Sequence, residues 1–225
     1  MNITRETIKG NGFSVPSIVF TPSDLQGAAV IIHGYGGSKE EQLGLAYRVA
    51  EAGLKTFVID LRGHGENMLS LDEKVLFDVE NVIKYCKSLG KTVAIGHSLG
   101  GRLALISSAD FAIGISPALN KIFGEETQKI LTNVRGYRVK EVFSGKFLEI
   151  LQKLPRVNFN DDMKKTIIYG SRDIPEIVNS CNSFKNGNSS VIEIENAMHS
   201  DIFTLENTFQ SVISQIKKWR EQNDM

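Results

Sequence analysis

Short apolar runs alternate with segments of helical periodicity along most of this chain, and this alternation limits the possible folds more than any other feature. Continuous apolar runs of five or six residues are typical of strands that are buried on both faces of a parallel sheet. Neighbouring parallel strands need crossover connections, which are usually helices. The sequence therefore predicts an α/β fold with a mostly parallel central sheet flanked by helices. The predicted buried strands are Ala28–His33, Lys55–Asp60, Thr92–Gly96, Phe111–Ser116 and Lys165–Tyr169.

Periodic apolar positions predict helices between these strands, and two further extended runs open the chain. The first two runs, Thr4–Lys9 and Ser14–Phe20, flank a glycine-containing turn at 10–12 and predict a hairpin. Ser190–Ile194 predicts a last strand before the closing helix. The predicted helices are 38–52, Asp72–Leu89, Leu99–Ser108, Pro175–Phe184 and Thr204–Gln222.

The alternation is interrupted between residues 117 and 162. This segment has no strongly apolar strand run, but Gly145–Leu154 has the pattern of an amphipathic helix that ends before Pro155. A chain of 225 residues fits one α/β domain. We therefore predict one domain over residues 1–225, in which 117–162 forms a short helical cap inserted over the site.

The charge balance argues against nucleic acid and membranes as partners. Lys and Arg total 26, as do Asp and Glu, so there is no overall attraction to polyanions. The first ten residues lack the apolar stretch of a signal peptide, and no window approaches the roughly 20 apolar residues of a membrane span. Cys86 and Cys181 have no metal-binding spacing and are interpreted as reduced thiols. These features predict a cytoplasmic protein, and nothing in them specifies an oligomeric state.

A candidate nucleophile lies directly after the predicted strand Thr92–Gly96. The sequence Gly96-His97-Ser98-Leu99-Gly100 joins this strand to a helix and matches the pattern G-x-S-x-G. A serine in such a tight strand-to-helix turn presents its hydroxyl above the sheet. The alternative is a glycine-rich helix start with a serine cap. The strand-turn-helix context favours Ser98 as a nucleophile.

A serine hydroxyl needs a base within hydrogen-bonding distance, and the chain contains four histidines. His33 and His64 follow early strands, and His97 adjoins Ser98, with its side chain expected to project away from the serine. His199 lies in the loop between the last predicted strand and the closing helix. Since active sites of parallel sheets form at the carboxyl ends of strands, His199 is the best candidate for the base.

The base in turn needs a carboxylate that fixes its tautomer. Asp173 follows the predicted strand Lys165–Tyr169 and lies between Ser98 and His199 in the sequence. Hydrolases whose nucleophilic serine lies in a strand-to-helix turn have this order of serine, acid and histidine. The alternative role for Asp173 is a turn or helix-capping acid before Pro175. Glu176 is the second candidate for the orienting carboxylate.

Two backbone amides are candidates for the oxyanion hole. Leu99 begins the helix after the serine, and Tyr35 lies in the glycine-rich sequence His33-Gly34-Tyr35-Gly36-Gly37. Glycines in this loop allow the backbone to approach a substrate closely. The Tyr35 ring, Phe143 and Phe147 are candidate substrate-binding groups. For the two phenylalanines, simple packing of the cap on the body is the alternative.

No pattern for a metal or cofactor is present. The sequence lacks HExxH, CxxC and the lysine-containing spacing of a phosphate-binding loop, so we predict neither a metal nor a cofactor. Residues 121–156 contain eight Lys or Arg and four Glu, and a solvated cap surface is favoured over an anion site.

With these motifs, the chain resembles the α/β-hydrolase superfamily, in particular its small esterase, lipase and serine-aminopeptidase-like group. The matching motifs are HGYGG (33–37), DLRGHG (60–65), GHSLGG (96–101), GSRD (170–173) and the late His199. The resemblance implies an α/β-hydrolase fold, and it implies structural roles for Asp60, Arg62 and His64. Two features differ from the group: Met198 precedes His199, where a glycine is common, and the short cap does not indicate a particular subgroup.

Together these features predict a serine hydrolase that cleaves a carboxylic ester of a small-molecule acyl substrate through an acyl-enzyme, with Ser98, His199 and Asp173 as catalytic residues. A peptidase, a thioesterase or an acyltransferase would use the same residues. A binding protein on this scaffold is the alternative from another class. Loss of a catalytic residue would mark such a protein, and none is lost here.

Overall fold

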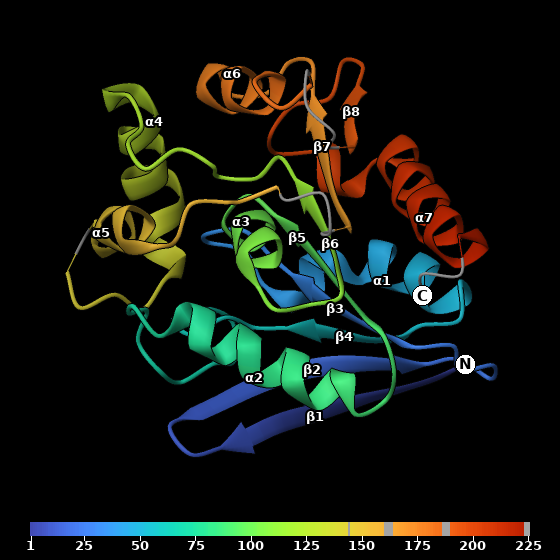
Figure 1. The fold of residues 1–225 in the computed structure, drawn as a ribbon. Helices are drawn as coiled ribbons and strands as arrows, with labels where there is room; N and C mark the ends of the chain where they lie inside the picture. The colour runs from blue at the N-terminus through green and yellow to red at the C-terminus, as the bar shows by residue number, and fades with distance from the viewer. Residues whose placement is uncertain (144, 160–163, 186–189, 223–225) are drawn as a thin grey trace.

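The computed structural model describes residues 1–143, 145–159, 164–185 and 190–222, and these residues form one eight-stranded sheet covered by helices (Figure 1). The strand order is β1-β2-β4-β3-β5-β6-β7-β8. Strand β2 runs antiparallel to both of its neighbours, and the other pairs are parallel. The predicted fold class, a mostly parallel sheet flanked by helices, is confirmed. The strands are β1 Asn2–Gly10, β2 Phe13–Thr21, β3 Ala28–Ile32, β4 Lys55–Ile59, β5 Thr92–His97, β6 Phe111–Ile115, β7 Lys164–Gly170 and β8 Ser190–Ile194.

The helices lie close to their predicted positions, with ends that differ by a few residues. Asp72, for example, precedes its helix because its carboxylate accepts hydrogen bonds from the Arg62 side chain and the Lys74 amide. The α-helices are α1 Leu43–Glu51, α2 Val75–Lys87, α3 Leu99–Ile106, α4 Glu125–Ile130, α5 Lys146–Lys153, α6 Pro175–Asn182 and α7 Glu206–Glu221. Short 3₁₀-helices occupy Lys39–Gln42, Gly136–Arg138 and Ile202–Thr204, and a π-helical turn occupies Leu131–Arg135.

Strand β3, inside the sheet, contributes side chains to two separate hydrophobic cores. In β3, Ala28, Val30 and Ile32 pack on the side of α2 and α3. The alternate residues Ala29 and Ile31 pack on the side of α1 and α7. This alternation explains why β3 is apolar throughout, since a strand with helices on both faces has no solvent-facing side chains.

The segment between β6 and β7 carries α4, α5 and the two turns between them, and α4 and α5 lie together on the left in Figure 1. Of these, the sequence predicted only the helix that became α5. Helix α4 was missed because its sequence, EETQKI, is short and mostly polar. The predicted end of the cap, residue 162, lies outside the described residues.

A buried arginine ties both ends of this segment to the body of the domain. Arg102 in α3 is fully buried. One guanidinium nitrogen donates to the carbonyls of Ala118 and Asn120, at 3.3 and 3.2 Å. The other donates to the carbonyls of Leu154 and Pro155, at 2.9 and 3.1 Å. Burial lowers the pKa of Arg102 to about 10, so the group stays charged at neutral pH.

The turn between β5 and α3 depends on two glycines. A Cβ atom at Gly96 would lie 2.1 Å from the carbonyl oxygen of Gly100, and one at Gly100 would lie 2.2 Å from the carbonyl oxygen of Ile32. Both obstacles are backbone atoms, which cannot move aside as a side chain can. The turn can therefore bring α3 against β3 and β5 only with glycine at these two positions.

We predict that Gly100→Ala strongly destabilises the protein, because relief of the backbone clash requires α3 to shift. The expected loss is at least about 3 kcal/mol of unfolding free energy, measured by urea denaturation. Gly44→Ala, in α1, is the matched control, since its Cβ would meet only the ring of Phe209, at 3.3 Å. A Gly100→Ala protein as stable as the control would contradict this account.

Candidate active site

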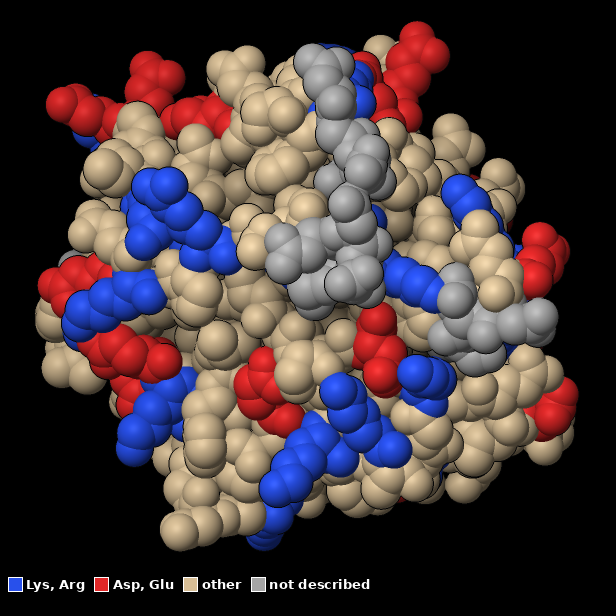
Figure 2. All heavy atoms as spheres, in the orientation of Figure 1, with Lys and Arg blue, Asp and Glu red and all other residues tan. Residues whose placement is uncertain are grey.

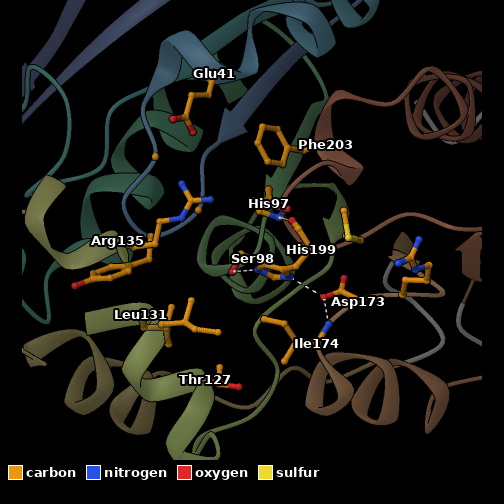
Figure 3. Close-up of a pocket in the computed structure, with 17 residues that line it drawn as sticks. Glu41, His97, Ser98, Thr127, Leu131, Arg135, Asp173, Ile174, His199 and Phe203 are labelled. Atoms are coloured by element: carbon orange, nitrogen blue, oxygen red, sulfur yellow. Dashed lines mark hydrogen bonds and ion pairs between the residues drawn. The ribbon is translucent and has the colours of Figure 1, made fainter. Parts of the chain in front are cut away.

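Three side chains from three strand ends form one hydrogen-bonded chain (Figure 3). Ser98 follows β5, Asp173 follows β7 and His199 follows β8. The distance between Ser98 Oγ and His199 Nε2 is 3.0 Å, and the distance between His199 Nδ1 and Asp173 Oδ1 is 2.8 Å. Since a carboxylate only accepts, Nδ1 carries the proton, and Nε2 is free to accept the hydroxyl proton of Ser98. The structure thus brings together the three residues that the sequence singled out.

The backbone at Ser98 is in a conformation that non-glycine residues rarely adopt. Its φ and ψ are 53° and −112°. Neighbouring strands and loops hold it there, because the Ser98 amide donates to the Ile115 carbonyl and the Ser98 carbonyl accepts from Ala118. Strained residues of this kind persist at functional sites where the surrounding structure over-determines them. The strain places the half-buried serine side chain in the cavity, next to His199.

Asp173 is buried, and its two carboxylate oxygens have separate partners. Oδ1 accepts from His199 and from the backbone amide of Ile174, at 2.7 Å. Oδ2 accepts from the hydroxyl of Ser116. Of the alternative roles considered for Asp173, the turn role is thus present beside the contact with His199, whereas the N-cap position of α6 belongs to Ile174, and α6 has no side-chain cap. Ser116 was missed because a serine at the end of β6 carries no motif.

Glu176, the second candidate for this carboxylate, has a different set of contacts. Its side chain accepts from the Gly124 amide at 3.0 Å and from the Thr127 hydroxyl at 3.1 Å. Although burial alone would raise the pKa of Glu176, these bonds lower it below the ordinary value for glutamate. Glu176 thus anchors α4 to α6, and it has no hydrogen bond to His199.

His97 contacts His199 directly, which the sequence analysis did not foresee. The His97 ring lies 4.9 Å from the His199 ring, and its Nε2–H donates to the His199 carbonyl at 2.9 Å. Burial, followed by the influence of His199, lowers the pKa of His97 well below the ordinary value. His97 therefore supports the loop that carries His199 and lies in the wall of the cavity.

The motif DLRGHG forms buried contacts between loops. Asp60 accepts from the amide and the ammonium group of Lys39, at 2.9 and 2.6 Å, and from the Glu66 amide at 2.9 Å. Arg62 donates twice to Asp78, at 2.8 and 2.7 Å. The buried His64 ring lies 4.9 Å from the His33 ring. These contacts agree with the structural role that the resemblance implied.

The two candidate oxyanion amides flank Ser98. Leu99 is the first residue of α3, where a backbone N–H has no partner inside the helix. The loop that contains Tyr35 also approaches Ser98 closely, since a Cβ atom at Gly34 would lie 3.2 Å from the Ser98 Cβ. The macrodipole of α3 favours negative charge at this point. The arrangement is suited to an anion that develops next to the serine.

The Tyr35 side chain is held by two groups of the segment between β6 and β7. Its ring stacks on Phe147, with the ring centroids 4.1 Å apart. Its hydroxyl donates to Glu141 at 2.5 Å. Burial, together with this carboxylate, raises the pKa of Tyr35 above the ordinary value, so the phenol stays protonated. The ring thus joins the glycine-rich loop to α5.

A cavity of about 370 Å³ opens beside Ser98 and His199. A smaller recess of about 20 Å³ adjoins the same two residues and is otherwise lined mostly by apolar side chains. The larger cavity includes Tyr35, Glu41, Leu131, Arg135, Arg172 and Phe203 among its lining residues, and the recess includes Ala118, Phe123, Leu131, Phe147, Ile174 and Ile177.

The two predicted phenylalanines differ in position. Phe147 lies on the buried face of α5 and lines the recess. Phe143 is 48% exposed, contacts the ammonium group of Lys146 and lines neither cavity. It precedes α5, and Gly145, with a φ of 89°, changes the chain direction between them. Of the two predicted phenylalanines, only Phe147 is thus among the residues that line these two cavities.

Comparison with known proteins agrees with this architecture. The family described as the alpha/beta hydrolase fold matches residues 28–117, which include β3 to β6 and Ser98. This chain has the alpha/beta hydrolase fold. An esterase of Pyrobaculum calidifontis is similar, with a TM-score of 0.70 and 18% identity over 97% of this chain and 84% of that chain. Est1E of Butyrivibrio proteoclasticus with bound ferulic acid has a TM-score of 0.69 and 19% identity over 96% of this chain and 98% of that chain.

The chain also resembles a curated protein from Danio rerio, the sn-1-specific diacylglycerol lipase ABHD11. The two are 28% identical over an alignment 132 residues long, and this alignment covers 53% of this chain and 37% of the relative. The match thus spans little more than a third of that lipase. Within the described residues of this chain, no helix has the length and apolar character needed to cross a bilayer.

The buried histidines of this protein lead to a prediction about pH and stability. Burial lowers the pKa of His33 to about 4 and that of His64 to about 3. The unfolded chain then binds more protons than the folded one, so stability falls as the pH drops below about 6.5. His33 contributes about 2 kcal/mol of this loss between pH 7 and pH 5.

Urea unfolding of wild type and His33→Gln at pH 7 and pH 5 tests this prediction. Glutamine can replace the ring, which accepts from the Leu61 amide and donates to the Gly34 carbonyl. The difference between the two pH dependences therefore reports the titration of His33 together with its influence on the pKa of the neighbouring His64. Equal losses of stability in the two proteins would contradict the assignment.

Proposed function

We propose that this protein is a serine hydrolase that cleaves a carboxylic ester through an acyl-enzyme intermediate. The observation that carries the proposal is the hydrogen-bonded chain from Ser98 Oγ through His199 to Asp173, at 3.0 and 2.8 Å. A serine with a base in contact, and a base with an orienting carboxylate, is the arrangement that activates a weak hydroxyl nucleophile.

In the proposed reaction, Ser98 Oγ attacks the ester carbonyl while His199 Nε2 takes the hydroxyl proton. The negative charge on the carbonyl oxygen is stabilised by the amides of Tyr35 and Leu99. The tetrahedral intermediate collapses, His199 donates its proton to the leaving alcohol, and the acyl group stays on Ser98. His199 then deprotonates a water molecule that hydrolyses the acyl-enzyme, and Asp173 stabilises the imidazolium in both steps.

The choice of an ester is supported by the kinds of protein that this chain resembles. The similar structures include esterases, and the one from Butyrivibrio proteoclasticus binds ferulic acid, a small aromatic acid. The open volume beside Ser98, about 370 Å³, is in the range typical of small-molecule sites. Peptidase, thioesterase and acyltransferase activities would use the same catalytic chain, so the bond cleaved is decided by a substrate panel.

We further propose that residues 117–162 act as a cap that forms one wall of the substrate site. Leu131 and Arg135 from this segment line the larger cavity, and Phe147 lines the recess. In this proposal Phe147 and the Tyr35 ring are the substrate-binding aromatics. The small apolar recess, which adjoins the nucleophile, suits the shorter of the two groups joined by the scissile ester.

Labelling with a fluorophosphonate probe tests for the activated serine. Wild type is expected to be labelled covalently, and Ser98→Ala to be unlabelled because it lacks the hydroxyl. His199→Ala is expected to label far more slowly since the base is lost. Ser107→Ala, at a buried serine whose hydroxyl donates to the Ala104 carbonyl, is the control. Folded wild type that resists the probe would overturn the proposal.

The orienting carboxylate is tested by two isosteric substitutions. Asp173→Asn is expected to reduce kcat on a short-chain p-nitrophenyl ester by about 10⁴-fold, as in comparable triads. Glu176→Gln is expected to retain most of the wild-type kcat, because Glu176 contacts α4 and not His199. The reverse pattern would assign the orienting role to Glu176.

A further inference from the structure

The cavity beside Ser98 contains two arginines without a carboxylate partner. Arg135, at the end of the turn Leu131–Arg135, and Arg172, in the loop after β7, both line it. Among the described residues, neither guanidinium has a hydrogen bond or ion pair with another side chain. Other arginines that the structure describes, such as Arg62 and Arg138, are paired with carboxylates.

The position of Arg135 is set by its backbone. A Cβ atom at Gly36 would lie 2.8 Å from the Arg135 Cβ and 3.0 Å from its carbonyl oxygen, so the arginine packs directly on the glycine-rich loop. Figure 3 shows its side chain in the cavity, between Glu41 and Ser98. After burial and His199, the charge of Arg135 is a further influence that lowers the pKa of His97.

The carboxylates in the same cavity are already engaged. Glu41 accepts from the guanidinium of Arg138 at 3.0 Å. Asp173 accepts from His199, Ser116 and the Ile174 amide. Arg135 and Arg172 therefore contribute positive charge that these groups do not neutralise. The outer face drawn in Figure 2 differs, since basic and acidic residues are interspersed on it.

Size separates the two parts of the site. The apolar recess next to Ser98 has about 20 Å³, room for a group the size of one or two methyl groups. The larger part of a substrate must therefore lie in the cavity of about 370 Å³ that contains the arginines. A guanidinium presents a planar pair of N–H donors that matches the oxygens of a carboxylate or a phosphate.

We propose that the substrate is an anionic ester: its small apolar group enters the recess, and its larger part carries a carboxylate or phosphate that binds Arg135, with support from Arg172. This inference rests on the proposed ester hydrolysis and adds the charge of the substrate to it. It also revises the expectation that the basic residues of 121–156 serve only as a solvated surface. Arg135 is a substrate-binding residue in this proposal, and it takes no part in the bond-breaking steps.

Two pairs of esters test the proposal. In the first pair, 4-acetoxybenzoate carries a carboxylate on the alcohol side of the ester, and 4-acetoxybenzamide carries an uncharged amide at the same place. In the second pair, monomethyl terephthalate carries a carboxylate on the acyl side, and methyl 4-carbamoylbenzoate carries an uncharged amide there. Phenyl phosphate, as an inhibitor of the reaction with p-nitrophenyl acetate, distinguishes phosphate from carboxylate recognition. The measured quantity is kcat/KM for each ester in wild type, Arg135→Gln, Arg135→Lys and Arg172→Gln.

Arg135→Gln is expected to reduce kcat/KM for the preferred carboxylate ester by about tenfold, mainly through KM, since a charge-assisted contact is lost. The kcat/KM of the same variant for the matched neutral ester is expected to change by less than about twofold. Arg135→Lys is expected to retain part of the preference, because the charge stays while the paired donors are lost. Arg172→Gln is expected to show a smaller loss, since Arg172 is more exposed to solvent.

Arg156→Gln is the matched control, since Arg156 belongs to the same segment, is exposed and lines neither cavity. Equal losses for the charged and neutral esters in Arg135→Gln, or equal effects in Arg156→Gln, would overturn the anionic substrate and leave the hydrolase intact. Hydrolysis of neutral esters alone would do the same. Failure of wild type to react with every ester and with the fluorophosphonate probe would instead overturn the proposed function.

Discussion

The site depends on the close approach of three backbone segments around Ser98. Gly96 and Gly100 allow β5, α3 and the end of β3 to approach so closely that even one Cβ atom would overlap a carbonyl oxygen. This packing holds Ser98 in its unusual backbone conformation, directly before the first residue of α3. The positions of the proposed nucleophile, the candidate oxyanion donors and the α3 dipole thus follow from one steric arrangement.

A second constraint holds the wall of the cavity in place. The buried guanidinium of Arg102 donates to four carbonyls at the two ends of the segment between β6 and β7. Removal of a guanidinium from water is costly, and the four bonds from its two terminal nitrogens offset part of this cost, so they favour one position for both ends of the segment. Glu176 fixes α4 in addition, and the Tyr35–Phe147 stack fixes α5. Together they set the position from which Arg135 reaches the cavity.

Charge is distributed in the site according to burial. His33, His64 and His97 are fully or almost fully buried, and burial disfavours their protonated forms. They can therefore pack against the catalytic loops without adding positive charge. His199 is less buried, at 23% exposure, and its neutral tautomer is set by Asp173. Among the residues that the structure describes, Arg135 and Arg172 line the same cavity without a carboxylate partner, and in our proposal their charge acts on the substrate.

The sequence by itself determined the fold class and the chain order of Ser98, Asp173 and His199. Apolar periodicity defines buried strands, and parallel strands bring their carboxyl ends to one edge. Only the tertiary structure decided the partners of these residues. Ser116 reaches Asp173 across 57 positions of the chain, and His97 reaches His199 across 102. Periodicity describes which face of an element is buried, whereas such contacts depend on how separate elements pack. The packing also decides that Arg135 lines the cavity and that Phe143 is not among its lining residues.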